Sequence, residues 1–338
     1  MKVHFTADLP TDGALIVPVF EGALSTSSLT DLDARTGGAV KRGMAAASFT
    51  GKSGQSLTIP GPAEMPDAVI LLLGQGKAKT MGAEDHRALG GKAFAAVNGR
   101  YETAALTLTG LGEAGLETAA AAAHVALGGR LRSYDFDIYR RKTKDTDKKV
   151  VEAFSVVTAS SGDAQSLFAV EDAVAGGVRV ARDLVTEPPN ILHPESFAER
   201  CKDLEKLGVE VTILDEAKMT ELGMGSLLGV GQGSVRGSRL VSMLWKGGPA
   251  DQKPVAFIGK GVTFDTGGIS IKPSAGMEDM KFDMGGAGAV TGAMHAIAAR
   301  KAKANVVGLI GLVENMPDGN AQRPSVVVTS MSGLTVVV

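Results

Sequence analysis

The sequence predicts an α/β fold with two domains, each built on a parallel or mixed sheet flanked by helices. Three observations support this prediction. The 338 residues are enough for about two domains of ~150 residues each. Short apolar segments alternate with helical ones, which is the pattern of strands joined through helices. The run Thr186-Glu-Pro-Pro-Asn stops a long helical pattern, because two prolines cannot continue a helix.

The first predicted domain spans residues 1–162 and contains strands of almost continuous apolar character. Residues 14–20 and 68–73 carry no charged side chain, as expected for buried strands of a largely parallel sheet. The basic run 140–149 is interleaved with Asp, so we expect a solvated loop, with an anionic-partner site as the alternative. Strands are expected at 14–20, 56–59, 68–73, 104–109 and 150–158, and helices at 83–98 and 117–131.

The second predicted domain spans residues 163–338 and opens with a helical pattern over 163–184. The same alternation then resumes, so a second sheet with flanking helices is expected. A strand at 255–258 runs directly into a glycine-rich segment. Further strands are expected at 209–214, 239–245 and 334–338, and helices at 194–207, 216–222 and 285–299.

Composition excludes several classes of protein. A formal net charge of −2 argues against a protein that binds nucleic acid through a basic surface. The single cysteine, Cys201, excludes an intrachain disulfide framework and fits a reducing compartment. Its place in a helical pattern predicts a packed residue rather than a nucleophile. No secretory signal or membrane-spanning run is visible, so a soluble cytoplasmic protein is expected. The five histidines contain no i, i+4 pair, which excludes a zincin-type site.

The chemically informative segment runs from Gly259 to Gly288 and contains Lys260, Asp265, Lys272 and Asp283 among small residues. It follows a strand, and open α/β sheets bind ligands outside the carboxyl ends of their strands. Carboxylates are hard ligands for divalent cations, and a lysine joins them when its amine is neutral. Another interpretation stays open: Asp283 would cap the helix 285–299, and both lysines would be solvated.

This segment resembles the signature of the leucyl, or cytosolic, aminopeptidase family over about thirty consecutive residues. Segments on either side resemble the same family: 182–190 its interdomain segment, 222–234 a glycine-rich segment, and 315–324 the approach to its last ligand loop. The resemblance is most specific from about 180 to 335. It implies a two-metal exopeptidase with its catalytic domain in the second half.

The resemblance also implies a role for each residue. Lys260 and Asp283 would bind one metal, and Asp265 would bridge two. Lys272 would stay charged, polarise the substrate carbonyl and stabilise the tetrahedral intermediate. The ions implied are Zn²⁺ or Mn²⁺, with Mg²⁺ as a further option, and together they would activate a bridging water.

The family resemblance extends to substrate, partners and assembly. Peptides would lose their N-terminal residue, leucine preferred, and the complete protein would form a homohexamer and use bicarbonate as a base. Neither a membrane nor nucleic acid is expected as a partner. The alternatives are an inactive structural subunit and a relative that binds DNA or a regulator.

The family's next motif, Asn-Thr-Asp-Ala-Glu-Gly-Arg, would follow the strand Leu334–Val338, where the sequence ends. We therefore expect a catalytic domain that is incomplete at its C-terminus, either as a fragment or as a truncated product. For the 338 residues alone we expect at most one weakly held metal and little or no peptidase activity. Exposed apolar surface is expected where later strands and helices would pack.

Overall fold

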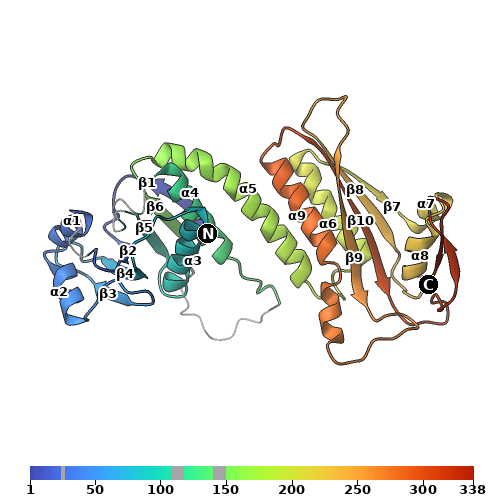
Figure 1. The fold of residues 1–338 in the computed structure, drawn as a ribbon, viewed down its shortest axis with the longest axis horizontal. Coiled ribbons are helices and arrows are strands. Elements are labelled where there is room, and N and C mark those ends of the chain that lie inside the picture. The colour runs from blue at the N-terminus through green and yellow to red at the C-terminus, as the bar shows by residue number, and fades with distance from the viewer. Residues whose placement is uncertain (24–26, 109–110, 112–117, 140–149) are drawn as a thin grey trace. The chain divides into compact units, whose positions relative to one another are not determined.

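The computed structural model describes residues 1–23, 27–108, 111, 118–139 and 150–338, and its ribbon is drawn in Figure 1. Two compact units, Met1–Asp172 and Ala173–Val338, meet within one helix. The predicted boundary at 162/163 lies at the start of that same helix. The basic run 140–149 lies outside the described residues.

The first unit is built on a six-stranded sheet with the order β1-β6-β5-β2-β4-β3. All neighbouring strands pair in parallel except β3 and β4, which are antiparallel. The elements are β1 (Lys2–Thr6), β2 (Gly13–Phe20), α1 (Ser27–Arg35), α2 (Ala39–Ala46), β3 (Ser56–Pro60), β4 (Ala68–Gly76), α3 (Ala83–Val97), β5 (Thr103–Thr107), α4 (Ala119–Arg132), β6 (Ala153–Val157) and the first part of α5 (Ser161–Thr186), which continues into the second unit.

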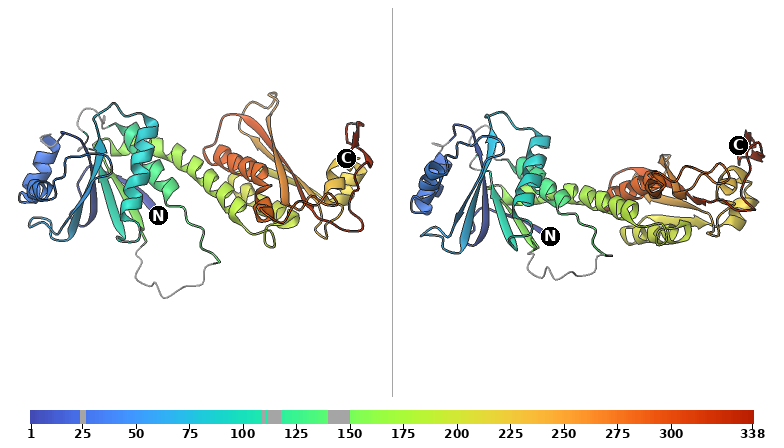
Figure 2. Two further views of the ribbon diagram at one scale, coloured as in Figure 1. Left: turned by 60° about the horizontal axis from the view of Figure 1, so that its bottom comes forward. Right: turned by 90° about the horizontal axis from the view of Figure 1, so that it is seen from below.

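Central strands and the helices packed on them form the core of this unit. Seven consecutive residues of β2 are buried, which confirms the prediction of a strand covered on both faces. Helices α3 and α4 lie side by side, as the two views in Figure 2 show. A Cβ placed on Gly90 would lie 1.9 Å from the carbonyl oxygen of Val125, so glycine is what allows this close approach.

The second unit is built on a four-stranded mixed sheet with the order β7-β8-β10-β9, and a separate two-stranded hairpin follows it. Strand β10 pairs antiparallel with β8 and parallel with β9. The elements are α6 (Pro194–Cys201), η2 (Lys202–Leu207), β7 (Glu210–Leu214), α7 (Glu216–Glu221), α8 (Gly225–Gly231), β8 (Arg239–Lys246), β9 (Val255–Asp265), η3 (Met277–Phe282), α9 (Gly285–Ala299), β10 (Asn305–Asn315), β11 (Val327–Thr329) and β12 (Thr335–Val337).

Helices cover both faces of β10. A Cβ on Gly308 would meet Met294 and Val290 of α9, whereas a Cβ on Gly311 would meet Leu227 of α8. Successive residues of a strand alternate between faces, so α9 and α8 lie on opposite sides of the sheet. The α/β fold with flanking helices is therefore confirmed in both units.

Strand β9 is the outer strand of this sheet among the described residues, where it pairs only with β10. Its first residues are exposed although they are apolar, and the exposed fraction of Ile258 is 80%. Apolar side chains are thus exposed along the first part of β9.

Several elements were not predicted from the sequence. Strands β1, β10 and β11 and helices α1, α2 and α8 have no counterpart among the expected elements. In addition, the helix expected at 194–207 is α-helical only to Cys201 and continues as the 3₁₀ helix η2. None of the described helices is long and apolar enough to cross a bilayer.

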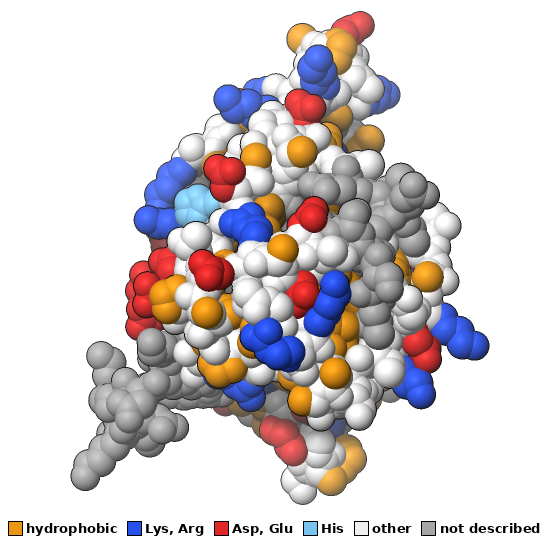
Figure 3. Space-filling model, turned by 90° about the vertical axis from the view of Figure 1, so that its left-hand side faces the viewer, with side chains coloured by type: hydrophobic (Ala, Val, Ile, Leu, Met, Phe, Trp, Pro, Cys, Tyr) orange, Lys and Arg blue, Asp and Glu red, His pale blue; other side chains and the backbone are white. Residues whose placement is uncertain are grey.

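Charges are mixed on the face of the molecule drawn in Figure 3. Lys and Arg side chains are interspersed there with Asp and Glu, and no broad single-sign patch appears among the described residues of that face. This pattern agrees with the small net charge of the chain.

Candidate metal centre

Two aspartate–lysine ion pairs form where the sequence predicted a metal site. Lys260 Nζ lies 2.7 Å from Asp283 Oδ1, and Lys272 Nζ lies 2.5 Å from Asp265 Oδ2. Lys260 and Asp265 both belong to β9, while Lys272 and Asp283 follow it along the chain. The structure therefore brings the four predicted residues together as two pairs.

Glycines on two elements bring Asp283 to Lys260. A Cβ on Gly259 of β9 would lie 2.6 Å from the carbonyl oxygen of Gly286, in the first turn of α9. A Cβ on Gly286 would in turn lie 3.0 Å from the backbone nitrogen of Lys260. Strand and helix start can approach this closely only because both positions lack side chains. The two glycines thus serve the approach of backbone to backbone.

A tight loop brings the chain back so that Lys272 lies beside Asp265. Gly267 and Gly268 have φ angles of +88° and +65°, a region that glycine adopts without steric cost. The Lys272 N–H then donates to the Thr266 carbonyl oxygen at 2.9 Å, which closes the loop. These contacts hold the Lys272 side chain over Asp265.

The Asp265 carboxylate accepts three hydrogen bonds. Its Oδ1 accepts from the Gly267 N–H at 2.9 Å and from Asn315 Nδ2 at 2.8 Å, and its Oδ2 accepts from Lys272. Burial by itself would raise the pKa of Asp265, but the hydrogen bonds from Lys272, Gly267 and Asn315 outweigh it and lower the pKa. The group is therefore an anion over a wide pH range.

Asp283 keeps one oxygen without a partner. Its Oδ1 pairs with Lys260, whereas Oδ2 is buried and accepts no hydrogen bond from the described residues. A buried acceptor of this kind costs about 1–3 kcal/mol when it stays unsatisfied. Helix α9 begins after Met284 and has no side-chain cap, so the interpretation of Asp283 as its N-cap is wrong.

The alternative of two solvated lysines fits Lys260 better than Lys272. The Lys260 side chain is 61% exposed, yet its amine is paired, and Lys272 is paired and less exposed. Lys272 Nζ also lies 3.3 Å from the sulfur of Met280, whose carbonyl oxygen accepts from the Asp283 N–H at 3.3 Å. Met280 therefore links the two ion pairs through η3.

The donor set fits a divalent cation in part. Asp265 and Asp283 supply the hard oxygen ligands that such ions prefer, and the unpartnered Asp283 Oδ2 is a free one. Lys260 becomes a ligand only after it loses its proton, and a nearby dication favours that loss. Among the described residues no group of three or more His, Cys, Asp or Glu side chains is placed to hold an ion. The residues present therefore make up part of one coordination shell.

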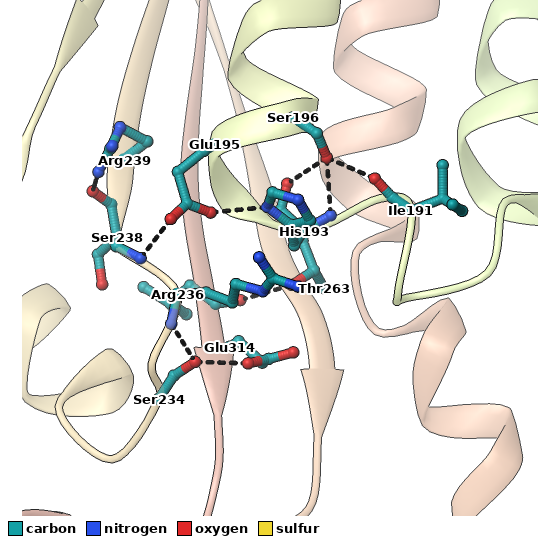
Figure 4. A network of polar contacts seen from close by, with 12 residues as sticks. Ile191, His193, Glu195, Ser196, Ser234, Arg236, Ser238, Arg239, Thr263 and Glu314 are labelled. Carbon is teal, nitrogen blue, oxygen red and sulfur yellow. Dashed lines mark hydrogen bonds and ion pairs between the residues drawn. The ribbon is translucent and has the colours of Figure 1, made fainter.

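A second polar network, drawn in Figure 4, joins the start of α6 and the end of β10 to the segment that precedes β8. Glu195 accepts from the Gly237 N–H at 2.6 Å and lies 2.7 Å from His193 Nδ1. Ser234 donates to Glu314 and accepts from the Arg236 N–H. Glu314 precedes Asn315, so this network helps to place the asparagine that contacts Asp265. Sequence reasoning missed Asn315 as a site residue, although Asn315 begins the segment 315–324 that resembles the family's approach to its last ligand loop.

Known proteins resemble this chain over nearly all of its length. Residues 179–338 match the cytosol aminopeptidase family, catalytic domain, and residues 16–143 match the N-terminal domain of the same family. A probable cytosol aminopeptidase of Rhizobium etli is 50% identical over 338 residues, which is 99% of this chain and 67% of the relative. One from Rhizobium rhizogenes is 57% identical over 297 residues, which is 86% of this chain and 58% of the relative.

Solved structures agree with these matches. A bottromycin maturation enzyme in complex with Mn superposes with a TM-score of 0.79 at 32% identity and covers 96% of this chain and 64% of that one. A tomato leucine aminopeptidase mutant superposes with a TM-score of 0.83 at 26% identity and covers 100% and 67%. The chain thus spans roughly three-fifths to two-thirds of the length of these proteins. By its sequence and its fold, this chain belongs to the cytosol aminopeptidase family.

Proposed function

We propose that the complete protein is a metal-dependent aminopeptidase that releases N-terminal residues, with leucine preferred, from peptides. This chain belongs to the cytosol aminopeptidase family, and one segment of it pairs Lys260 with Asp283 and Lys272 with Asp265. These two pairs are the observation that supports the proposal most directly. Nothing in the comparisons favours an inactive subunit or a DNA-binding relative.

Each of the four residues has a chemical task in this proposal. Lys260, Asp265 and Asp283 would hold divalent ions, which lower the pKa of a bound water and so supply a nucleophile near neutral pH. Lys272 lies next to Asp265, with its Nζ 2.5 Å from Asp265 Oδ2. An ammonium in that place stabilises the negative charge that develops on the substrate carbonyl oxygen. Asp283 Oδ2 offers a buried oxygen that has no hydrogen-bond partner in the part of the chain that the structure describes.

Finer assignments belong to the same proposal. We assign Zn²⁺ or Mn²⁺ as the ions, with Mg²⁺ as a further option, and peptides as the substrates. A homohexamer, a bicarbonate base and a cytoplasmic location rest on the family resemblance, and the buried free Cys201 agrees with a reducing compartment. For the 338 residues alone we propose one weakly held ion, because the resemblance assigns them three ligands, Lys260, Asp265 and Asp283.

Mn²⁺ titration tests the metal site on the chain itself. We expect calorimetry or the loss of the free-Mn²⁺ electron paramagnetic resonance signal to show one site, weakened at least tenfold in Asp283→Asn. Asp279→Asn is the control, because Asp279 lies in η3, the short helix that ends just before Asp283, and has no predicted metal role. Equal affinity in wild type and Asp283→Asn would contradict the site. Two tight sites would contradict the proposal of a single weak one.

A hydrolysis assay tests the activity. The protein is purified at its natural length, and its mass is measured by mass spectrometry. It is then incubated with leucine p-nitroanilide in the presence and absence of Mn²⁺. We expect metal-dependent hydrolysis that disappears when the leucine amine is acetylated, because an exopeptidase must bind a free amine. Equal rates on the acetylated substrate would exclude an aminopeptidase.

A further inference from the structure

Asn315 is the last residue of β10, and it contacts the site from a strand that carries none of the four predicted residues. Its Nδ2 donates to Asp265 Oδ1 at 2.8 Å. The two residues are also register partners in the parallel pair β10–β9, after a shift in register that follows Val313. The contact therefore depends on the register of β10 and β9 at their C-terminal ends.

The backbone and side chain of Asn315 are both held in place. Its carbonyl oxygen accepts from the Thr266 N–H at 3.0 Å and from Thr266 Oγ1 at 2.8 Å. Its Oδ1 lies against Gly268, where an added Cβ would come within 2.8 Å of it. The amide can meet a carboxylate only with its NH₂ group, because two facing acceptor oxygens repel each other. The donor orientation of Asn315 is thus set by its surroundings.

A count of lone pairs shows what this contact does to Asp265. A carboxylate oxygen accepts about two hydrogen bonds. Oδ1 already accepts two, from Gly267 and Asn315, whereas Oδ2 accepts one, from Lys272. Oδ2 is therefore the oxygen with acceptor capacity left for a cation. Bridging through both oxygens would require one of the Oδ1 donors to leave.

From this geometry we propose that Asn315 is a positioning residue that occupies Asp265 Oδ1 and so presents Oδ2 as the metal-binding oxygen. This inference rests on the proposed function, since it gives Asp265 the role of a ligand. Asn315 itself would not touch the ion. The hydrogen bond from Asn315 restricts rotation of the Asp265 carboxylate before an ion binds. Binding then costs less conformational entropy.

Substitution of Asn315 tests the proposal on the full 338-residue chain. Asn315→Leu keeps the volume and removes the donor, and we expect it to weaken Mn²⁺ binding at least tenfold. Asn315→Gln keeps an NH₂ donor, and we expect it to recover part of that loss. The bound Mn²⁺ resonance should broaden in Asn315→Leu, because the carboxylate then takes several orientations. Thermal unfolding of the metal-free variants measures their stability independently of metal binding.

Asn305 provides a matched control at the other end of the same strand. It is buried, and its side chain makes three hydrogen bonds, to Gly248, Pro249 and Gln252. Asn305→Leu should therefore lower the unfolding temperature more than Asn315→Leu and leave the Mn²⁺ affinity unchanged. If Asn305→Leu does not fold, Asn320→Leu serves instead, because Asn320 is exposed and bonds only Gln232 and Asp318 among the described residues.

The outcomes separate this inference from the proposed function. Wild-type affinity in Asn315→Leu, together with weakened binding in Asp283→Asn, would overturn the inference and leave the proposed function standing. An equal loss of affinity in the control variant would also overturn it, because the effect would then be one of general stability. No difference in binding between wild type and Asp283→Asn would overturn the proposed function and the inference together.

Discussion

Lys272 and Asp265 lie seven residues apart, and 2.5 Å separates Lys272 Nζ from Asp265 Oδ2. The loop between them turns through two glycines with positive φ angles and is closed by a backbone hydrogen bond from Lys272 to Thr266. The ion pair is therefore a product of local loop geometry. A change in that geometry should separate the pair without altering either charged residue.

Replacing Gly267 with alanine should open this loop. A Cβ there would lie 2.4 Å from the Ser270 carbonyl oxygen and 3.2 Å from Lys272 Cγ. Gly276→Ala is the matched control, since Gly276 also has a positive φ but no neighbour within 4 Å of the added Cβ. Both variants should lose about 1–2 kcal/mol from backbone strain, and Gly267→Ala should lose a further ~1–3 kcal/mol from overlap. Urea unfolding measures the difference, and equal losses would show that the loop absorbs the methyl group.

Glu195 should make the stability of the second unit depend on acid pH. Burial alone would raise the pKa of Glu195, but the backbone hydrogen bonds of its own N–H and of Gly237, together with that of His193, lower the pKa below its usual value. A lowered carboxyl pKa adds stability above the unfolded-state pKa, near 4.5, and that stability is lost as the pH falls through the lower folded-state value.

Glu195→Gln removes this titration. Because Glu195 is only partly buried, we expect a loss on the order of 1 kcal/mol near neutral pH, shrinking as the pH falls below about 4. Urea unfolding at several pH values measures it. Glu199→Gln, on the exposed side of the same helix, is the control and should change stability little at any pH. A pH-independent difference for Glu195→Gln would show that its hydrogen bonds, and not its charge, carry the effect.

Cys201 should be inert to alkylation in the folded chain. Its side chain is fully buried at the end of α6, and burial raises the pKa of the thiol to about 12. Because the thiolate is the reactive form, iodoacetamide should modify the native protein at least tenfold more slowly than the urea-unfolded protein. Mass spectrometry follows the reaction. Rapid modification under native conditions would mean that α6 opens readily from the core.

The β9 edge should drive self-association. Val255, Phe257 and Ile258 are exposed on a strand that pairs on one side only among the described residues, and exposed apolar edges promote strand pairing between chains. Ile258→Lys should therefore shift the mass measured by light scattering toward the monomer. Val235→Lys is the control, because Val235 is 98% exposed but lies outside any strand. Equal effects of both variants would point to charge alone.

Most of the regular elements could be predicted, but α8 could not. Its sequence, Gly225–Gly231, contains three glycines and has little intrinsic helix propensity. Packing decides in its favour: a Cβ on Gly231 would lie 2.2 Å from Ser238 Oγ, and Leu227 packs against Gly311 of β10. Strand β10 is itself an apolar run, which length and periodicity alone do not separate from a buried helix.

The local sequence supplies the chemistry of the site, namely two lysines and two aspartates in a glycine-rich segment after a strand. The pairing of Lys272 with Asp265 is a finding of the structure, and the long-range contacts come from the tertiary fold. Asn315 reaches Asp265 from 50 residues away through the pairing of β10 with β9, and Asp283 joins Lys260 because α9 starts against β9. Such contacts depend on strand register and on backbone approach between elements, and neither is encoded within a local stretch of residues.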